Sequence, residues 1–315
     1  MSNNLITNSN TSSLIEGRTI SSSWLDSFIA YLDVSPRTAD TYFKAVKQFL
    51  AWLYKNGIYQ PTREDIINYK EELTQKGYKP TTIQAYMTAV RLFFSWTDQE
   101  GLYSNVAQHV KGGKIGQGYR KDYLTKAQVK EVMAAIDTST IRGLRDYAII
   151  ALMITSGLRD IEVVRANIED IRPSGECSVL YVQGKGHTEK DTYQNLDVDT
   201  EIAIRAYLKA RGAVTPEEPL FTSLDHKNTG SRLTTRSVSR MVKTRLVEAG
   251  FNSPRLTAHS LRHTSITIAY LSGMPITEVQ QHARHTNIAT TMIYAHLLDR
   301  SKNRCASVIG NAIFH

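Results

Sequence analysis

Six side chains in the C-terminal half of the chain could together attack a phosphodiester. They are, in order, Arg159, Lys185, His259, Arg262, His285 and Tyr294. A guanidinium binds two phosphate oxygens at once and keeps its charge, so a pair of arginines can stabilise a phosphoryl-transfer transition state. A phenol can then be the nucleophile. This set of groups predicts phosphodiester chemistry that needs no metal ion.

The spacing of these residues supports one shared site. His259 and Arg262 are three residues apart, so on a helix they lie on one face and can address one phosphate. Tyr294 follows Thr290 and Thr291, which can cap a short helix whose end presents the phenol. Because an ordinary tyrosine has a pKa of about 10, cations or a base must activate it. His259 is the expected partner.

In order and spacing, the six positions resemble the catalytic set of the tyrosine site-specific recombinases, the family of phage integrases, Xer resolvases and Cre. The resemblance runs from about Ser22 to the C-terminus. It implies that Tyr294 attacks DNA to give a 3′-phosphotyrosyl enzyme and a free 5′ hydroxyl. It also implies that Lys185 is the general acid and that His285 hydrogen-bonds the phosphate. No cofactor is expected, because the ester keeps the bond energy and neither ATP nor a metal is required.

Three features depart from the family pattern or leave a choice. Arg284 stands before His285 where the family typically has glycine, so either the backbone there avoids a left-handed conformation or Arg284 adds a phosphate contact. Asp191 lies where a basic residue is frequent, and Lys190 is a neighbour of Lys185. The remaining nearby histidines are expected to be packing or surface residues; they are His263, His282 and His296.

Two other readings of the same residues stay open. His259 and His263 are four apart, as in zinc proteases, but Ser260 stands where the hydrolytic glutamate of such a helix should be. A DNA-binding protein of the same fold without catalysis is the second alternative. The filled catalytic positions argue against it, and activity decides.

Composition fits a globular protein with an acidic partner. The 315 residues carry a net charge of +8, with ten basic against ten acidic residues up to residue 110 and 28 against 20 after it. No apolar run is long enough for a membrane span, and the polar start is unlike a secretory signal, so the expected location is the cytoplasm, at the nucleoid. Cys177 and Cys305 are expected to be reduced packing residues.

The predicted fold is mainly α with a small antiparallel β-sheet, in two domains that close as a clamp on DNA. A flexible tail is expected over 1–20, a four-helix core-binding domain of SAM-like type over 21–108, a basic glycine-rich linker over 109–123 and the catalytic domain over 124–315. Residues expected to contact DNA are Arg37, Lys44, Lys47, Lys79, Thr81, Thr82, Arg91, Lys114, Arg120, Lys121 and Arg284.

Within the catalytic domain, periodicity and turn residues predict further elements. A capped helix should start at Thr125, an apolar helix should cover 144–154, and a hairpin should join 179–182 to 192–196 around a turn at 184–188. Further helices are expected over 199–211, 234–249, 257–272, 275–284, 288–295 and 300–310. The resemblance implies double-stranded DNA as partner and a homotetramer on two sites. In this tetramer, the C-terminal helix is expected to be exchanged between protomers. DNA-bending accessory proteins are a further possible class of partner.

Overall fold

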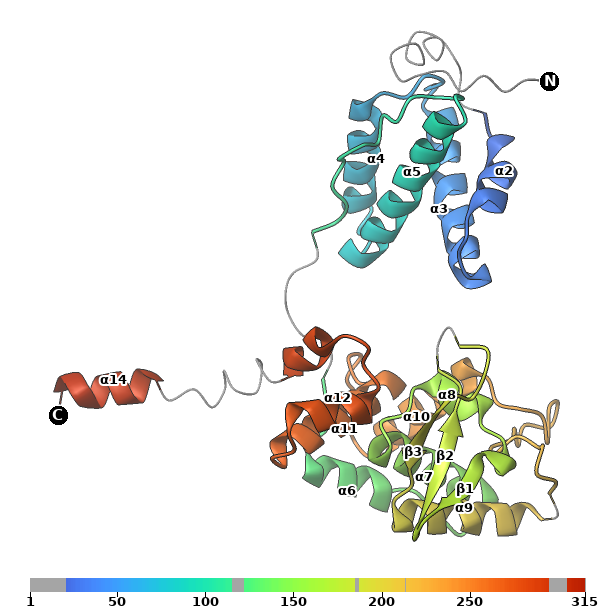
Figure 1. Ribbon diagram of the computed structural model, residues 1–315, viewed down its shortest axis with the longest axis vertical. Coiled ribbons are helices and arrows are strands. Elements are labelled where there is room, and N and C mark those ends of the chain that lie inside the picture. Colours follow the sequence, from blue (N-terminus) through green and yellow to red (C-terminus); the bar gives the residue numbers. More distant parts are fainter. Residues whose placement is uncertain (1–20, 115–121, 185–186, 213, 295–304, 315) are drawn as a thin grey trace. The chain divides into compact units, whose positions relative to one another are not determined.

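The computed structural model describes residues 21–114, 122–184, 187–212, 214–294 and 305–314. The chain divides into two compact units between Gln117 and Gly118 (Figure 1). The expected tail at 1–20, three of the predicted functional residues and His296 lie outside the described residues; those three are Lys185, Arg120 and Lys121.

In its described residues, the first unit consists of four helices, as the sequence predicts. These are α2 (Trp24–Tyr31), α3 (Pro36–Lys55), α4 (Arg63–Gln75) and α5 (Pro80–Gln99). The start of α3 follows from its sequence, because the Ser35 hydroxyl accepts from the Thr38 amide at 3.4 Å and Pro36 takes the first helical position. Thr62 and Asp65 form a reciprocal cap at the start of α4.

Aromatic side chains fill the core of this unit. Phe28, Phe49, Phe93 and Phe94 are completely buried, and the rings of Phe28 and Phe93 meet edge to face with centroids 5.4 Å apart. These aromatic side chains therefore form the core of the unit and are not exposed for stacking on bases. Val110 also belongs to this core, so the beginning of the expected linker is part of the first unit.

The second unit combines helices with one small sheet (Figure 1). Its helices are α6 (Lys126–Ala134), α7 (Ile141–Thr155), α8 (Asp160–Arg165), the 3₁₀ turn η1 (Ile168–Asp170), α9 (Val198–Arg211), α10 (Thr235–Glu248), α11 (Ala258–Leu271), α12 (Ile276–Ala283), a helix over 288–294, and α14 (Cys305–Phe314). Each predicted helix has a counterpart, while α8 and η1 were not predicted. No described helix is long and apolar enough to cross a membrane.

The sheet has three antiparallel strands in the order β1, β2, β3. They are β1 (Ile171–Ser174), β2 (Cys177–Val182) and β3 (Thr192–Asn195). Leu180 in β2 pairs with Ile171 on one side and Gln194 on the other. The predicted hairpin is thus confirmed, and β1 is an addition to it. Cys177 is exposed at the start of β2, so its prediction as a packing residue was wrong.

Helix α7 lies in the centre of the second core. Its residues Ile149, Ile150, Leu152 and Met153 are completely buried, since α7 packs against both α9 and α11. A helix buried all around carries apolar residues on every face, which explains the continuous apolar run in the sequence. Its C-terminal end leads directly to the first residue of the candidate site.

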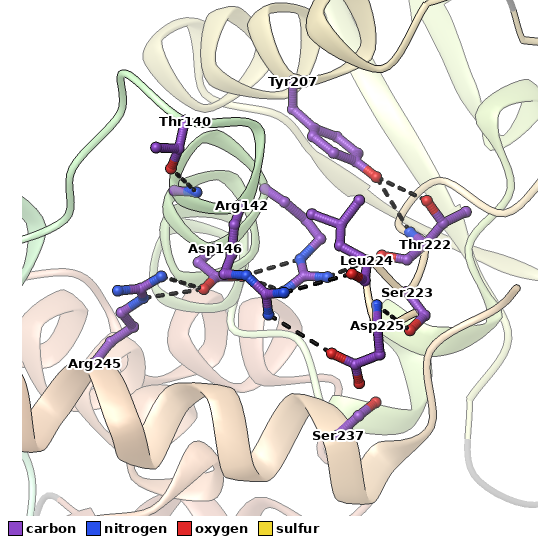
Figure 2. Close-up of polar contacts among 12 residues, drawn as sticks. Thr140, Arg142, Asp146, Tyr207, Thr222, Ser223, Leu224, Asp225, Ser237 and Arg245 are labelled. Atoms are coloured by element: carbon purple, nitrogen blue, oxygen red, sulfur yellow. Dashed lines mark hydrogen bonds and ion pairs between the residues drawn. The ribbon is translucent and has the colours of Figure 1, made fainter. Parts of the chain in front are cut away.

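A buried ionic cluster joins α7 to α10 at the other end of α7. Both oxygens of the buried Asp146 accept from guanidiniums: Oδ1 from Arg145 at 2.7 Å and Oδ2 from Arg245 at 2.7 Å. Figure 2 shows Arg245 reaching from α10 to Asp146. Arg145 also donates to the Thr222 carbonyl at 3.1 Å, so the cluster holds the 222–225 loop as well.

Candidate active site

Arg159 is presented by a tight turn after α7. Gly157 has φ +59°, the left-handed conformation that glycine adopts without a Cβ clash, and a Cβ there would lie 3.0 Å from Nε2 of His282. Arg159 then caps α8 together with Glu162, whose Oε2 accepts from the Arg159 amide at 2.8 Å. The Arg159 guanidinium donates to Glu162 Oε1 at 2.9 Å and stays partly exposed, while the Glu162 side chain is buried. Arg159 is therefore held by a fixed carboxylate with donors left for a ligand.

Arg262 on α11 is anchored by two backbone carbonyls. Its Nη1 donates to the Gly157 carbonyl at 2.5 Å and its Nη2 donates to the Ala283 carbonyl, and the residue is almost completely buried. Burial and the nearby Arg159 guanidinium lower the pKa of Arg262 to about 9, which leaves it charged at neutral pH. The two arginines thus form one concentrated positive site on the C-terminal ends of α7 and α12.

His285 follows α12 and lies beside this positive site. Its Nδ1 is 2.9 Å from the Thr291 hydroxyl, and its backbone is tied to Gln280 on α12 in both directions. Burial, followed by the charges of Arg262 and Arg159, lowers the pKa of His285 to about 4. The imidazole is therefore neutral at physiological pH, and it can hydrogen-bond a phosphate without adding charge.

Tyr294 completes the site from the helix described over 288–294. It is only 5% exposed and belongs to a small apolar cluster with Ile266, Val279 and Ala283. Its ring lies nearly parallel to that of His285, with centroids 6.5 Å apart. The helix is capped by Asn287, whose side-chain oxygen accepts from the Ala289 amide at 2.8 Å. The predicted cap by Thr290 and Thr291 was therefore wrong.

The hydrogen bond to the Tyr294 hydroxyl comes from a residue that the sequence reading set aside. Nδ1 of His263 contacts the Tyr294 hydroxyl directly, and the two rings have centroids 5.5 Å apart. His259 lies one turn earlier on α11 and is exposed, with its ring edge-on to that of His263 at 4.5 Å. The prediction that His263 is a plain packing or surface residue was wrong. Its spacing of four from His259 was the available signal.

His282 is packed inside the protein, as the sequence reading expected. Its Nε2 is 2.7 Å from the Ser265 hydroxyl, and its backbone carbonyl accepts from Gln194 at 2.8 Å. Burial lowers the pKa of His282. On α11, the Ser260 hydroxyl donates to the Arg255 carbonyl at 3.1 Å. Within the described residues, no three His, Cys, Asp or Glu side chains gather as a metal site would require.

Arg284 has a left-handed backbone conformation, which one of the two alternatives from the sequence did not expect. Its φ is 50° and ψ 48°, so this arginine takes a conformation that favours glycine. The possibility that the backbone avoids this conformation was wrong. Nη2 of Arg284 donates to Glu162 Oε2 at 2.5 Å, and Nη1 is buried without a hydrogen-bond partner in the described part of the chain. Arg284 and Arg159 therefore share one carboxylate.

The hairpin tip next to Lys185 carries its own ion pairs. Lys190 donates to the buried Asp170 at 2.5 Å, and His187 pairs with Asp191 at 2.7 Å. Lys190 is thus already engaged away from the arginines, which leaves Lys185 as the lysine of interest.

The predicted DNA contacts of the first unit lie mostly on its surface. Arg37, Lys47, Lys79 and Thr81 are exposed, and Thr82 is partly exposed. Lys44 pairs with Asp40 at 2.6 Å, and Arg91 donates to Thr88 at 3.1 Å and to the Val110 carbonyl. Lys114 is exposed at the end of the described stretch. The exposed side chains among these residues are accessible to a DNA backbone.

A basic groove on α10 escaped the sequence reading. It is lined by Arg236, Arg240 and Lys243 on α10, together with Asp160 next to Arg159 and Thr257 just before His259. The three cations are spaced by four and three residues, so they share one helix face, and this pattern was visible in the sequence. The groove begins at residues adjacent to the two candidate catalytic segments.

Comparison with known proteins agrees with this architecture. Residues 122–301 match the phage integrase family, and residues 24–102 match the N-terminal SAM-like domain of phage integrases. A tyrosine recombinase of Synechocystis sp. is 30% identical over 275 residues, which cover 82% of this chain and 86% of that protein. One from Synechococcus elongatus is 33% identical over 189 residues, covering 59% of this chain and 58% of its own length.

The fold has counterparts among solved structures as well. A crystal structure of the XerH site-specific recombinase, bound to a palindromic difH substrate after cleavage, superposes with a TM-score of 0.73 at 20% identity. The alignment covers 98% of this chain and 91% of that one. The chain therefore belongs to the phage integrase family of tyrosine recombinases, and the recognition and the fold class predicted from the sequence are confirmed.

Proposed function

We propose that this protein is a site-specific DNA recombinase that cuts and rejoins DNA through a 3′-phosphotyrosyl intermediate. The observation that carries the proposal is the convergence of Arg159, Arg262, His285 and Tyr294, from four separate segments, around one positive site. Two anchored guanidiniums lie near the nucleophile, and the Glu162 carboxylate between the arginines is already paired with Arg159 and Arg284.

The residues divide the reaction between them. Arg159 and Arg262 bind the non-bridging oxygens of the scissile phosphate, and neutral His285 adds a hydrogen bond. The Tyr294 oxygen bonds to phosphorus, and the 5′ oxygen leaves with a proton supplied by Lys185. His259, exposed beside the site, completes the set. Attack by the 5′ hydroxyl of another strand reverses the steps and rejoins DNA, so no ATP is consumed.

DNA outside the scissile phosphate contacts both units in this proposal. The exposed basic residues of the first unit and the linker, with Lys114, Arg120 and Lys121, follow the phosphate backbone. The α10 groove continues the positive surface from the active site. Arg284 strengthens the same field from its place against Glu162.

Assembly on two DNA sites as a homotetramer is part of the proposal. Helix α14 exposes Val308, Ile309 and Ile313, which are 61%, 56% and 66% accessible. An apolar helix face of this kind suits packing on a neighbouring protomer. The biological outcome is the integration or excision of a mobile element, or the resolution of dimers, in nucleoid DNA, with or without DNA-bending accessory proteins.

Covalent capture tests the function without knowing the target. The protein is expressed with DNA of its source, complexes are denatured, and DNA fragments that stay attached are sequenced. We expect one recurrent sequence, recovered again by pure protein in EDTA without ATP, and no attachment with Tyr294→Phe. Specific binding with no covalent product would favour a non-catalytic DNA-binding protein, and cleavage only with an added metal ion would favour a hydrolase.

A further inference from the structure

His263 contacts the attacking oxygen, and it is outside the catalytic set implied by the resemblance. Nδ1 of His263 contacts the Tyr294 hydroxyl, and both residues are largely removed from solvent. His263 follows Arg262 directly on α11, so the anchor that fixes one phosphate-binding arginine also fixes this imidazole. A group placed this way can accept the proton that the phenol must lose.

We infer that His263 is the general base for Tyr294, an inference that rests on the proposed function. The tautomer with its proton on Nε2 leaves Nδ1 as acceptor for the phenol O–H. As the Tyr294 oxygen bonds to phosphorus, the phenolic proton passes to Nδ1. The bond from phosphorus to the 5′ oxygen breaks, and that oxygen takes its electron pair and a proton from the ammonium of the general acid. In religation the proton on His263 returns to the phenol.

The surroundings favour this direction of proton transfer. The ring of His259 meets His263 edge-on at 4.5 Å, on the exposed side of α11, so a proton on His263 has a neighbour that communicates with solvent. The His285 ring also lies near the phenol ring, with centroids 6.5 Å apart, and it is kept neutral by burial and nearby arginines. Charged and titratable groups in the same site include His259, Arg262, Arg159, Glu162, Arg284 and His285.

The substitution His263→Asn separates a base from a mere hydrogen-bond partner. The Asn oxygen occupies nearly the place of Nδ1 and accepts a hydrogen bond, but it does not take up a proton at neutral pH. Single-turnover cleavage of a suicide substrate built on the captured site should fall by about 10²- to 10⁴-fold, with DNA binding and thermal unfolding unchanged. Its rate should then rise about tenfold per pH unit, as hydroxide replaces the missing base.

A substrate with sulfur in place of the 5′ bridging oxygen distinguishes the base from the acid. Sulfur leaves without a proton, so this substrate should restore cleavage by Lys185→Ala and should not restore it in His263→Asn. His226→Asn, an exposed histidine in the 222–231 loop, is the control and should cleave like the wild type.

Two results would overturn the inference: cleavage by His263→Asn within a few-fold of the wild type, or its rescue by the sulfur substrate. Either one leaves the proposed function intact as long as Tyr294→Phe forms no adduct. Adduct formation by Tyr294→Phe would instead remove the proposed function itself.

Discussion

At the scale of single residues, the site depends on positive charge: the fold gathers three arginines around a single carboxylate, which neutralises only part of their charge. Arg159, Arg262 and Arg284 lie around one carboxylate, that of Glu162. A positive site without bound anion is costly for the folded protein, and it is prepared for a phosphate. The same field keeps His285 neutral.

The first prediction concerns the contribution of His285 to the stability of the protein at acid pH. The pKa of His285 is about 4 in the folded protein and 6.5 ordinarily. Between pH 4 and pH 6.5, therefore, His285 is protonated in the unfolded chain and neutral in the folded protein. Stability should therefore fall as pH drops from about 6.5 to 4. His285→Gln should show a smaller fall of the unfolding temperature between pH 7 and pH 5. Part of the fall in unfolding temperature should persist in this variant, because the pKa of His282 is also lowered. An unchanged pH dependence in this variant would contradict the assigned shift.

The second prediction concerns the backbone at Arg284. Both Arg284→Gly and Arg284→Ala remove the contact to Glu162, but only glycine is free of strain at φ 50°. The glycine variant should be more stable than the alanine variant by about 1–2 kcal/mol in urea unfolding. Equal stability of the two would show that the residue leaves the left-handed conformation in solution.

Sequence reading succeeded for residues with a local signature and failed where contacts are distant. Arg159 and Arg262 were recognised by their segments. His263 was set aside because its partner lies 31 residues away, and only the packing of α11 against the segment after α12 brings them together. The pairing of Arg284 with Glu162 spans 122 residues and has no sequence pattern at all.

At the scale of elements, α7 links the core to the site. It is buried on all sides, ends at the turn that presents Arg159, and is held near its start by the cluster of Arg145, Asp146 and Arg245. Figure 2 shows the contact between Asp146 and Arg245. An element held at both ends keeps the Arg159 turn fixed relative to α11. Precise placement of a phosphate requires such rigid support.

The third prediction tests that fastening. Asp146→Asn leaves two guanidiniums facing a neutral amide in a buried place, which should cost about 3–5 kcal/mol of unfolding free energy. Asp225→Asn is the matched control, because the Asp225 pair with Arg142 is exposed and 3.7 Å long; its cost should stay within about 0.5 kcal/mol. Similar destabilisation of both variants would mean that the buried cluster is not a special anchor.

The elements themselves were largely predictable. Helices with a cap residue and a clear apolar stripe, such as the one starting after Thr125, were found close to their observed bounds. Strand β1 was missed because its residues Ile171–Ser174 include a proline and no alternation of apolar side chains. Helix α8 has only six residues, fewer than periodicity can reveal.

At the scale of the whole molecule, charge is unevenly distributed along the chain. The first 110 residues are neutral in sum, and the excess lies in the remainder with the catalytic residues and α10. Such a distribution predicts that the second unit supplies most of the phosphate contacts. The first unit then mainly positions the protein on its site.

The fourth prediction measures the contribution of the α10 groove. Neutralising Arg236 and Arg240 together should weaken DNA binding at all sequences and lower the slope of log K against log salt by about 2, because two phosphates would no longer be neutralised. Neutralising the exposed Lys130 and Lys209, on α6 and α9, should leave the slope nearly unchanged. A similar change of slope in both double variants would show that the loss of positive charge matters and its position in the groove does not.

The central claim is that Tyr294 carries the DNA during strand exchange, and the direct measurement is the chemical identity of the adduct. The trapped complex is digested with protease and nuclease, and the cross-linked peptide is sequenced by mass spectrometry. We expect a nucleotide joined through its 3′ phosphate to Tyr294, a free 5′ hydroxyl on the other DNA end, and no adduct from Tyr294→Phe. Attachment to another residue, or through a 5′ phosphate, would contradict it.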